Sequence, residues 1–262
     1  MRIIVCIKQV PATTDVAVDE TTGVLKREGI KTRLNPYDLY ALETALRLRG
    51  AHGGEITALT MGPLQARSVI AESFMMGVDH GYLISDRAFA GADVWATARA
   101  ISESIKLLGD YDLIICGKQT TDGDTAQVGP EIAELLGIPH LSNVLSLGVP
   151  DKGSLPALTD MGDSRIELSV RLPALITVEK GINTPRLPSY RRKQASAGRE
   201  IPVIALSDLA ESRPELYGLR GSPTQVERVF VPEADNTHEV WEDAPAFLAR
   251  RLVGELRGRK LL

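Results

Sequence analysis

Cysteine is scarce in this sequence, and its scarcity excludes a disulfide framework. The chain has 2 cysteines in 262 residues, Cys6 and Cys116, and both lie in apolar, strand-like segments that predict buried structural thiols. The 4 histidines are scattered, so no spacing of histidine and cysteine indicates a metal site. Aromatic residues make up 5% of the chain, which argues against a pocket built largely from stacked protein rings.

Long apolar runs and an excess of charge of one sign are also missing. No run approaches the length of a membrane span, and Met1 leads straight into a strand pattern without a signal peptide. The net charge is −4 with acids and bases interspersed, so nothing calls for nucleic acid or an anionic membrane as partner. We therefore expect a cytoplasmic protein. With 44% apolar residues it can bury a large core, as one domain or a domain plus an extension.

The most informative stretch, 112–139, is predicted to form a strand, a polar loop and a helix. Residues 113–116 are typical of a strand buried on both faces, and the helix at 126–136 ends at Gly137. The loop between them, 118–125, contains no large apolar residue. It is a candidate anion site, because free N–H groups and the positive end of the helix dipole face the crevice there. An ordinary capped loop fits the spacing equally well. Neither a P-loop nor a G-x-G-x-x-G motif occurs in the chain.

Four strand–loop–helix units follow one another in the first half of the chain. The strands are predicted at 2–7, 55–60, 81–84 and 113–116, and the helices at 36–49, 64–76, 92–108 and 126–136. Asn35 as N-cap, Pro36 at the first helical position and Asp38 as an acid in the first turn explain how the first helix begins. Parallel neighbours need right-handed helical crossovers, so this alternation predicts an α/β protein with a doubly wound, mostly parallel sheet. Residues 15–34 suggest a short hairpin or loop.

After Pro139 the pattern changes to strands and turns. Residues 144–149 and 166–178 are predicted strands, and the turn sequences between them suggest hairpins that extend or flank the sheet. The stretch 183–199 is rich in arginine and lysine and is expected to be a solvated loop.

The last part of the chain contains little regular structure. Residues 201–232 have no long periodic segment, and 241–262 is predicted to be one arginine-rich helix. Irregular chain of this length rarely packs alone, so we expect an extended C-terminal arm that wraps a partner subunit.

One motif in the candidate anion loop resembles a known family closely. It reads Gly117-Lys118-Gln119-Thr120-Thr121-Asp122-Gly123-Asp124-Thr125-Ala126-Gln127-Val128-Gly129-Pro130, and it is similar to the nucleotide-binding segment of electron-transfer flavoprotein β subunits, the ETF β or FixA family. Four further stretches resemble the same family in its order: 3–11, 34–38, 60–63 and 85–93. The resemblance implies an adenine-nucleotide α-hydrolase-like fold. It implies a nucleotide- or flavin-binding domain at 1–185, followed by a recognition loop and an arm at 186–262 that wraps the α subunit.

The resemblance also implies which residues bind the cofactor. They are Cys6, Lys8, Asn35, Met61, Asp86, Arg87, Phe89, Ala90, Gly91, Ala92, Asp93, Thr97, Gly117, Asp122, Gly123, Asp124, Thr125, Ala126, Gln127 and Val128. Leu187, Pro188, Ser189 and Tyr190, here called the docking segment, correspond to the family's recognition loop, which anchors to a partner dehydrogenase. No side chain is an obvious catalytic acid, base or nucleophile, as expected where flavins do the chemistry.

Two sub-types of the family remain open. Residues 122–130 and 86–93 resemble the electron-bifurcating group, in which this subunit holds FAD and reacts with NADH. In that case the phosphates are expected on the backbone of 125–128, and Arg87 beside the flavin ring. In simpler carriers the subunit holds AMP, and Arg87 would be a surface residue paired with Asp86 or Asp93. The acceptor could be an acyl-CoA dehydrogenase, a quinone reductase or a ferredoxin.

Two functions outside the family are alternatives. One is a nucleotide-sensing module of similar fold without a redox role. The other, an adenylating enzyme, is disfavoured because no Ser-Gly-Gly-rich loop follows the first strand.

Overall fold

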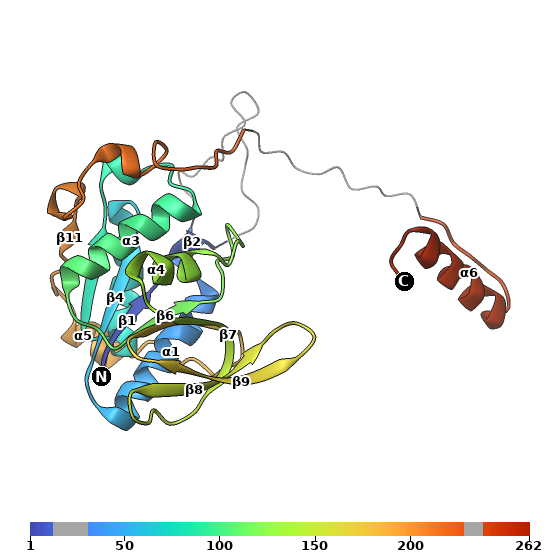
Figure 1. The fold of residues 1–262 in the computed structure, drawn as a ribbon, viewed down its shortest axis with the longest axis horizontal. Coiled ribbons are helices and arrows are strands. Elements are labelled where there is room, and N and C mark those ends of the chain that lie inside the picture. Colours follow the sequence, from blue (N-terminus) through green and yellow to red (C-terminus); the bar gives the residue numbers. More distant parts are fainter. Residues whose placement is uncertain (13–30, 228–237) are drawn as a thin grey trace. The chain divides into compact units, whose positions relative to one another are not determined.

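The computed structural model describes residues 1–12, 31–227 and 238–262 (Figure 1). The chain forms two units, Met1–Glu227 and Arg228–Leu262, which are considered separately. The first unit thus includes the docking segment and the chain that follows it as far as Glu227. No helix in the described ranges is long and apolar enough to cross a membrane.

The first unit is built on a nine-stranded sheet in the order β11-β5-β4-β1-β6-β10-β7-β8-β9. The strands are β1 (Arg2–Cys6), β4 (Glu55–Met61), β5 (His80–Ile84), β6 (Leu113–Gly117), β7 (His140–Leu147), β8 (Ser154–Asp160), β9 (Arg165–Arg171), β10 (Ala174–Val178) and β11 (Val203–Ile204). Neighbours from β11 to β7 are parallel, whereas β8 and β9 add an antiparallel edge. The predicted α/β class and mostly parallel sheet are confirmed.

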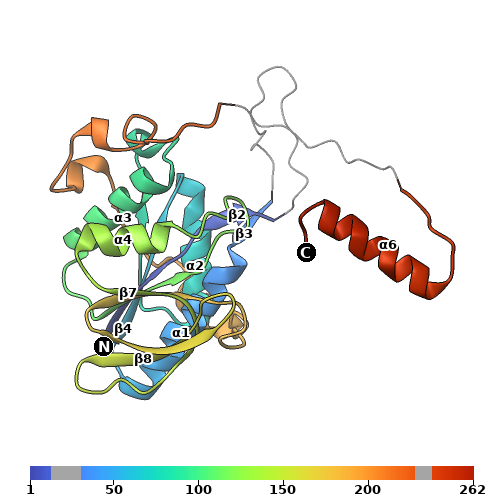
Figure 2. The ribbon, with the colours of Figure 1, turned by 45° about the vertical axis from the view of Figure 1, so that its right-hand side comes forward.

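Helices cover both faces of this sheet (Figures 1 and 2). They are α1 (Pro36–His52), α2 (Arg67–Met76), α3 (Val94–Leu108) and α4 (Val128–Leu136). Because successive side chains of a strand point to opposite faces, Ile3 and Val5 pack in the core cluster of α1 and α2. Ile4, between them, packs in the cluster of α3 and α4. The sheet is therefore doubly wound.

Several predicted boundaries move for local physical reasons. The helix expected from residue 92 begins at Val94, because the Asp93 carboxylate caps it by accepting from the Ala96 amide at 3.0 Å. The helix expected over 64–76 starts with a 3₁₀ turn, Leu64–Ala66, before α2. Of the hairpin or loop expected at 15–34, residues 15–30 lie outside the described ranges. The chain on either side pairs as a small antiparallel ribbon, β2 (Gln9–Pro11) with β3 (Thr32–Leu34).

The prediction of a single strand over 166–178 is wrong. It is two strands, because Pro173 cannot donate to a ladder and the chain turns there from β9 into β10. Strand β10 then enters the middle of the sheet between β6 and β7.

The solvated loop expected at 183–199 contains a short helix, α5 (Tyr190–Ala195), which the Ser189 side chain caps. The next stretch also packs, in contrast to the expectation that it needs a partner to do so. Strand β11 pairs with β5, and Tyr217, 1% exposed, is buried in the cluster of α3 and α4.

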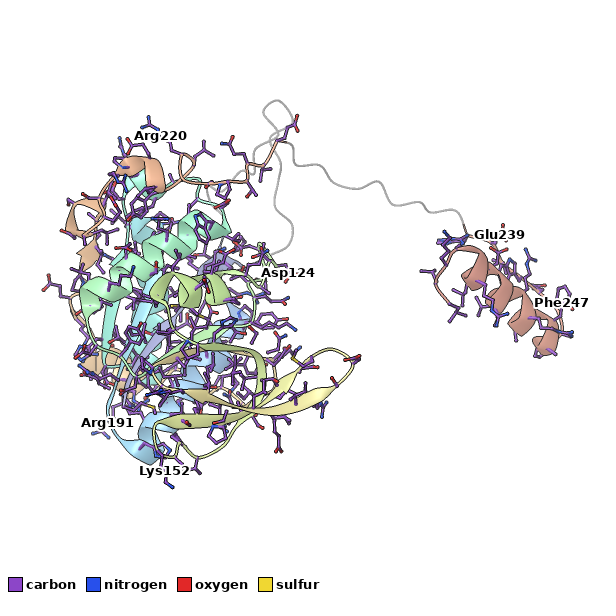
Figure 3. All side chains as sticks on the ribbon, in the orientation of Figure 1. Asp124, Lys152, Arg191, Arg220, Glu239 and Phe247 are labelled. Atoms are coloured by element: carbon purple, nitrogen blue, oxygen red, sulfur yellow. The ribbon has the colours of Figure 1, made fainter. Side chains whose placement is uncertain are left out.

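The second unit contains the predicted C-terminal helix, α6 (Pro245–Gly258), shorter than expected at both ends. Apolar Phe247, Leu252 and Val253 are exposed on it (Figure 3 labels Phe247). Just before the helix, Trp241 stacks under the Arg251 guanidinium at 4.2 Å.

Candidate functional site

The candidate site lies where the order of the strands reverses. Strand β1 is followed in sequence by β4 and β5 on one side, whereas β6 lies on its other side. Crevices at such switch points, outside the carboxyl ends of the strands, are the usual ligand sites of open α/β sheets. Parallel register brings the ends of these strands together, with Cys6 opposite Cys116 and Met61 opposite Ile84. The loops that follow β1, β4, β5 and β6 therefore meet at one edge of the sheet, the one formed by the carboxyl ends of the parallel strands.

A buried carboxyl group lies beneath this edge. Asp38, in the first turn of α1, is 4% exposed and accepts from the Lys8 amide at 2.7 Å and the Asn35 Nδ2 at 2.9 Å. Burial raises the pKa of Asp38 to about 7, against these hydrogen bonds, which favour the ionised form. Local sequence shows Asp38 only as an acid in the first turn of α1 and gives no sign of its contact with Lys8.

Asn35 links α1 to the candidate anion loop. Its side chain makes no cap bond to α1. Instead its Nδ2 donates to the Gln119 carbonyl at 2.9 Å, and its Oδ1 accepts from the Thr121 amide at 3.3 Å. Asn35 is therefore the N-cap residue of α1 as predicted, but its side chain does not cap the helix, because the loop engages it.

Charged side chains brace the loop after β6. Lys8 Nζ pairs with the Asp122 carboxylate at 2.8 Å, and Lys118 pairs with Glu179 on the β10 side. The Lys8 charge and hydrogen bond outweigh burial and lower the pKa of Asp122. The ion pair thus keeps a negative charge at the loop neutralised by a cation.

The end of this loop presents unused hydrogen-bond donors. Asp124 and Ala126 have left-handed backbones, with φ of 55° and 56°. The amides of Thr125, Ala126 and Gln127 donate to no acceptor in the described ranges, and α4 begins at the next residue. Thr125 and Gln127 are exposed, with Gly123 and Asp124 beside them. Free amides at the positive end of a helix form an anion-binding arrangement.

Gly117 is required by a close contact. A Cβ there would lie 2.5 Å from Asp38 Oδ1 and 2.8 Å from Tyr37 Cβ. The glycine therefore allows α1 to approach the end of β6.

The loop after β5 is held by its two carboxylates. Asp86 accepts from the amides of Ala88 at 2.9 Å and Leu206 at 3.1 Å. Asp93, besides capping α3, accepts from the Thr224 amide at 3.0 Å and hydroxyl at 2.8 Å. Burial raises the pKa of Asp93, but these bonds outweigh it and lower the pKa overall.

Neither carboxylate pairs with Arg87. This side chain is exposed and forms no ion pair with any residue that the structure describes. The interpretation of Arg87 as a surface partner of Asp86 or Asp93 is therefore not what the structure shows.

The remaining residues of this loop lie under a later segment, 217–222. Phe89 is 4% exposed and packs edge-on against Tyr217, with ring centroids 5.5 Å apart, so it belongs to the core. A Cβ on Gly91 would lie 3.2 Å from Leu219 Cβ, and the Leu219 amide donates to the Ala90 carbonyl at 2.9 Å. Leu219 therefore occupies the space beside Gly91, a residue that the family resemblance assigns to cofactor binding. Ala90 stays exposed, and Ala92 and Thr97 are half-buried near the start of α3.

The two cysteines lie side by side near the carboxyl ends of β1 and β6. Cys116 is buried as predicted, but Cys6 is partly exposed. A hydrogen bond with Cys6 and burial raise the pKa of the Cys116 thiol. The prediction of two buried thiols is thus correct for one of them.

The docking segment lies at the opposite end of the strands, where the parallel strands begin. The Ser189 amide donates to the Met75 carbonyl at 3.0 Å, at the end of α2, and this end precedes the beginning of β5. Leu187 and Tyr190 are 88% and 72% exposed. Figure 3 labels Arg191 on α5 here and Asp124 on the crevice loop. The residues predicted to bind cofactor and those predicted to dock a partner therefore occupy different surfaces.

Comparison with known proteins bears on this geometry. A family model described as "Electron transfer flavoprotein domain" matches residues 22–209. The chain is 41% identical to an electron transfer flavoprotein subunit beta of Thermoanaerobacterium thermosaccharolyticum, over 100% of both chains. It is 42% identical to the caffeyl-CoA reductase-Etf complex subunit CarD of Acetobacterium woodii, over 92% of this chain and 91% of the relative. It is 40% identical to Protein FixA of Azorhizobium caulinodans, over 89% and 85%.

Proposed function

The chain belongs to the electron transfer flavoprotein family as a subunit of the β or FixA type, and we propose that it binds FAD and takes electrons from NADH. In this proposal it forms a heterodimer with an α subunit and performs flavin-based electron bifurcation. The acceptors are an acyl-CoA dehydrogenase-type or quinone reductase flavoprotein and a ferredoxin, in the cytoplasm.

The observation that carries the proposal is the row of free amides before α4. Thr125, Ala126 and Gln127 offer N–H groups in an exposed loop with left-handed turns, which suits the phosphates of a dinucleotide. The Asn35 and Lys8 contacts fix this loop against β1 and α1. The residues present therefore fit the phosphate part of FAD.

The loop after β5 favours FAD over AMP. AMP requires only the loops after β1, β4 and β6, and it gives no role to an exposed, unpaired arginine beside the third loop. Arg87 and Ala90 remain open there, because both carboxylates of the loop are engaged by backbone donors. Bound FAD would supply the hydride and electron chemistry, and Arg87 would place positive charge where electron density grows on reduction.

The name of one relative supports a reductase-linked role, since that relative is named as a subunit of a caffeyl-CoA reductase–Etf complex. Several other relatives are named FixA. Both kinds match this chain at about the same identity as the relatives named only as β subunits, 42% and 40% against 41%.

The test is cofactor extraction from the co-purified heterodimer. We expect two FAD per heterodimer. Arg87→Ala should lower the reduction potential of one flavin by roughly 20 mV, as loss of about 1 kcal/mol of charge stabilisation implies for two electrons. Arg165→Ala, which removes a charge from the antiparallel edge, is the control and should change neither potential. One FAD with one AMP would refute the FAD and bifurcation proposal and leave a simpler electron carrier.

A further inference from the structure

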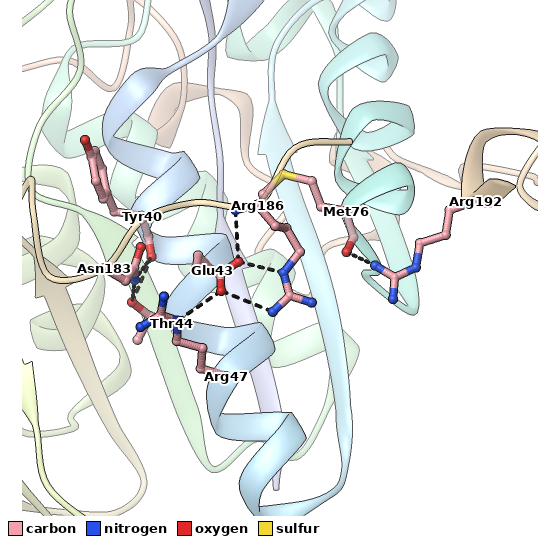
Figure 4. Close-up of polar contacts among 8 residues, drawn as sticks. All are labelled: Tyr40, Glu43, Thr44, Arg47, Met76, Asn183, Arg186 and Arg192. Carbon is pink, nitrogen blue, oxygen red and sulfur yellow. Dashed lines mark hydrogen bonds and ion pairs between the residues drawn. The ribbon is translucent and has the colours of Figure 1, made fainter. Parts of the chain in front are cut away.

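A buried acid in the middle of α1 is not explained by the crevice. The Glu43 side chain is 5% exposed, and its carboxylate lies on the face of α1 that the chain after β10 covers (Figure 4). A buried carboxylate is costly unless it is paired, so its partners indicate what it does.

The main partner of Glu43 is the residue just before the docking segment. Arg186 contacts the carboxylate with Nε at 2.7 Å and Nη2 at 3.1 Å, and its backbone amide donates to the same group at 3.3 Å. Arg47, one turn further along α1, adds a bond at 3.0 Å but is 56% exposed. Burial raises the pKa of Glu43, and Arg186 with Arg47 more than offsets this, so the pKa is lowered. The carboxylate is therefore ionised, and it binds side chain and backbone of Arg186 together.

Other contacts fix the chain upstream of Leu187 and downstream of Pro188. Upstream, Asn183 Nδ2 donates to the Tyr40 carbonyl at 3.0 Å and the Thr44 hydroxyl at 2.8 Å. Downstream, the Ser189 amide is bonded to Met75, and the Arg192 guanidinium donates to the Met76 carbonyl (Figure 4). The chain is thus tied to α1 before Leu187 and to α2 after Pro188.

Two apolar side chains of this stretch are exposed to solvent. Leu187 and Tyr190 are mostly exposed, and Arg191 and Lys193 beside them are exposed as well. An apolar bump flanked by cations is complementary to an apolar pocket with an acidic rim on a partner protein. Fixing the bump in advance removes the ordering cost of binding.

We propose that Glu43 is a positioning residue that holds Leu187 and Tyr190, through Arg186, in the conformation that the partner dehydrogenase binds. This inference rests on the proposed function, and it also assumes, as the family resemblance implies, that the docking segment binds the dehydrogenase. The Glu43 side chain is 5% exposed, its hydrogen bonds go to Arg186 and Arg47, and it acts on the segment through Arg186.

The first test measures the segment itself. Hydrogen–deuterium exchange is compared for wild-type heterodimer, Glu43→Gln and Arg186→Lys, which keeps the charge but loses the two-pronged contact. Exchange in the peptide covering 186–192 should rise about tenfold in Glu43→Gln and less in Arg186→Lys, with crevice peptides unchanged. Arg47→Gln removes the other partner of Glu43 and should leave 186–192 at the wild-type rate.

The second test measures docking on a purified acyl-CoA dehydrogenase. If the segment in Glu43→Gln adopts its docking conformation about one tenth of the time, the apparent KM of this variant for the dehydrogenase rises about tenfold. The kcat at saturation, the FAD content and dye reduction by NADH should not change. Leu187→Ala should raise KM too, and its combination with Glu43→Gln should be less than additive.

The outcomes separate the two proposals. Unchanged exchange at 186–192 in both variants, or loss of FAD or of the α subunit in Glu43→Gln and Arg186→Lys, overturns the positioning role. A wild-type KM in Glu43→Gln together with a raised KM in Leu187→Ala also overturns the positioning role. The assumption that the segment docks on the dehydrogenase then stands. A wild-type KM in Leu187→Ala overturns the docking segment itself, and with it this inference.

Discussion

Asp38 predicts an unusual dependence of stability on pH. This carboxyl is buried with a pKa of about 7, against a usual value of 3.8. An acid whose pKa is raised by folding binds more protons in the folded than in the unfolded state between the two pKa values. The free energy of unfolding must therefore fall as pH rises from about 4 and become constant above the folded pKa.

The magnitude follows from the shift. At full ionisation the difference of about 3 units corresponds to roughly 4 kcal/mol, at 1.36 kcal/mol per unit. Between pH 5 and pH 8 the expected loss is about 2.5 kcal/mol, since part of the effect has already occurred at pH 5. Asp38→Asn cannot ionise, so its stability should not carry this slope. This variant loses one hydrogen bond. In the wild type the Lys8 amide and the Asn35 side chain donate to different carboxylate oxygens of Asp38, whereas an amide has a single oxygen to accept them.

The assay is urea unfolding of the heterodimer at pH 5, 6, 7 and 8, for wild type and Asp38→Asn with the same partner subunit. The difference between the variants cancels the partner and the other titrating groups. Asp38→Asn should be the less stable at pH 5, and the gap should close or reverse at pH 8. A constant gap at every pH would refute the reasoning, and it would show that the hydrogen-bond donors around Asp38 keep it ionised throughout.

Two further predictions concern packing around the crevice. Gly117→Ala should destabilise by about 1–3 kcal/mol and reduce FAD retention, since its Cβ would overlap Asp38 and Tyr37. Gly50→Ala in α1 is the control, because nothing lies within 4 Å of the added Cβ; thermal unfolding and FAD content check both variants, and equal behaviour would contradict the steric argument. Tyr217→Ala should cost about 3–5 kcal/mol and speed hydrogen exchange of 86–93, because it removes the ring beneath Phe89. Tyr217→Phe loses only the hydroxyl contact to the Glu211 carbonyl and should leave the loop protected; protection of 86–93 in Tyr217→Ala would show that the loop is held otherwise.

The parallel core of the fold could be predicted from local pattern. Runs such as 113–116 are buried on both faces and bounded by turn residues, and each is followed by a helix of the right length. The place of β10 could not be predicted in this way. Its residues carry the same strand preference as β9, and its position between β6 and β7 depends on pairing with strands that are distant in the sequence.

In the candidate site, too, features set by local sequence could be predicted, and those set by contacts distant in the sequence could not. The polar loop before α4 was predicted as an anion site from its composition and its place after a strand, and its free amides agree with that hypothesis. The carboxyl of Asp38 and the amide of Asn35 were assigned to the helix start, because local sequence does not show contacts with Lys8 and Gln119. Gly91 was assigned to a ligand for the same reason, since Leu219 is 128 positions away.

Helix α1 did carry a signal that could have been used. Between positions 39 and 48 its only polar residues besides Tyr40 are Glu43, Thr44 and Arg47, and a helix this apolar around its circumference must be covered on more than one side. The sheet covers one side, and Glu43 and Thr44, both 4% exposed, lie under the chain at 183–186. A polar pair within such a helix predicts polar partners in the covering chain, which here are Asn183 and Arg186. The composition of α1 therefore implies that the stretch 183–186 is fixed, although nothing in that stretch alone distinguishes it from a solvated loop.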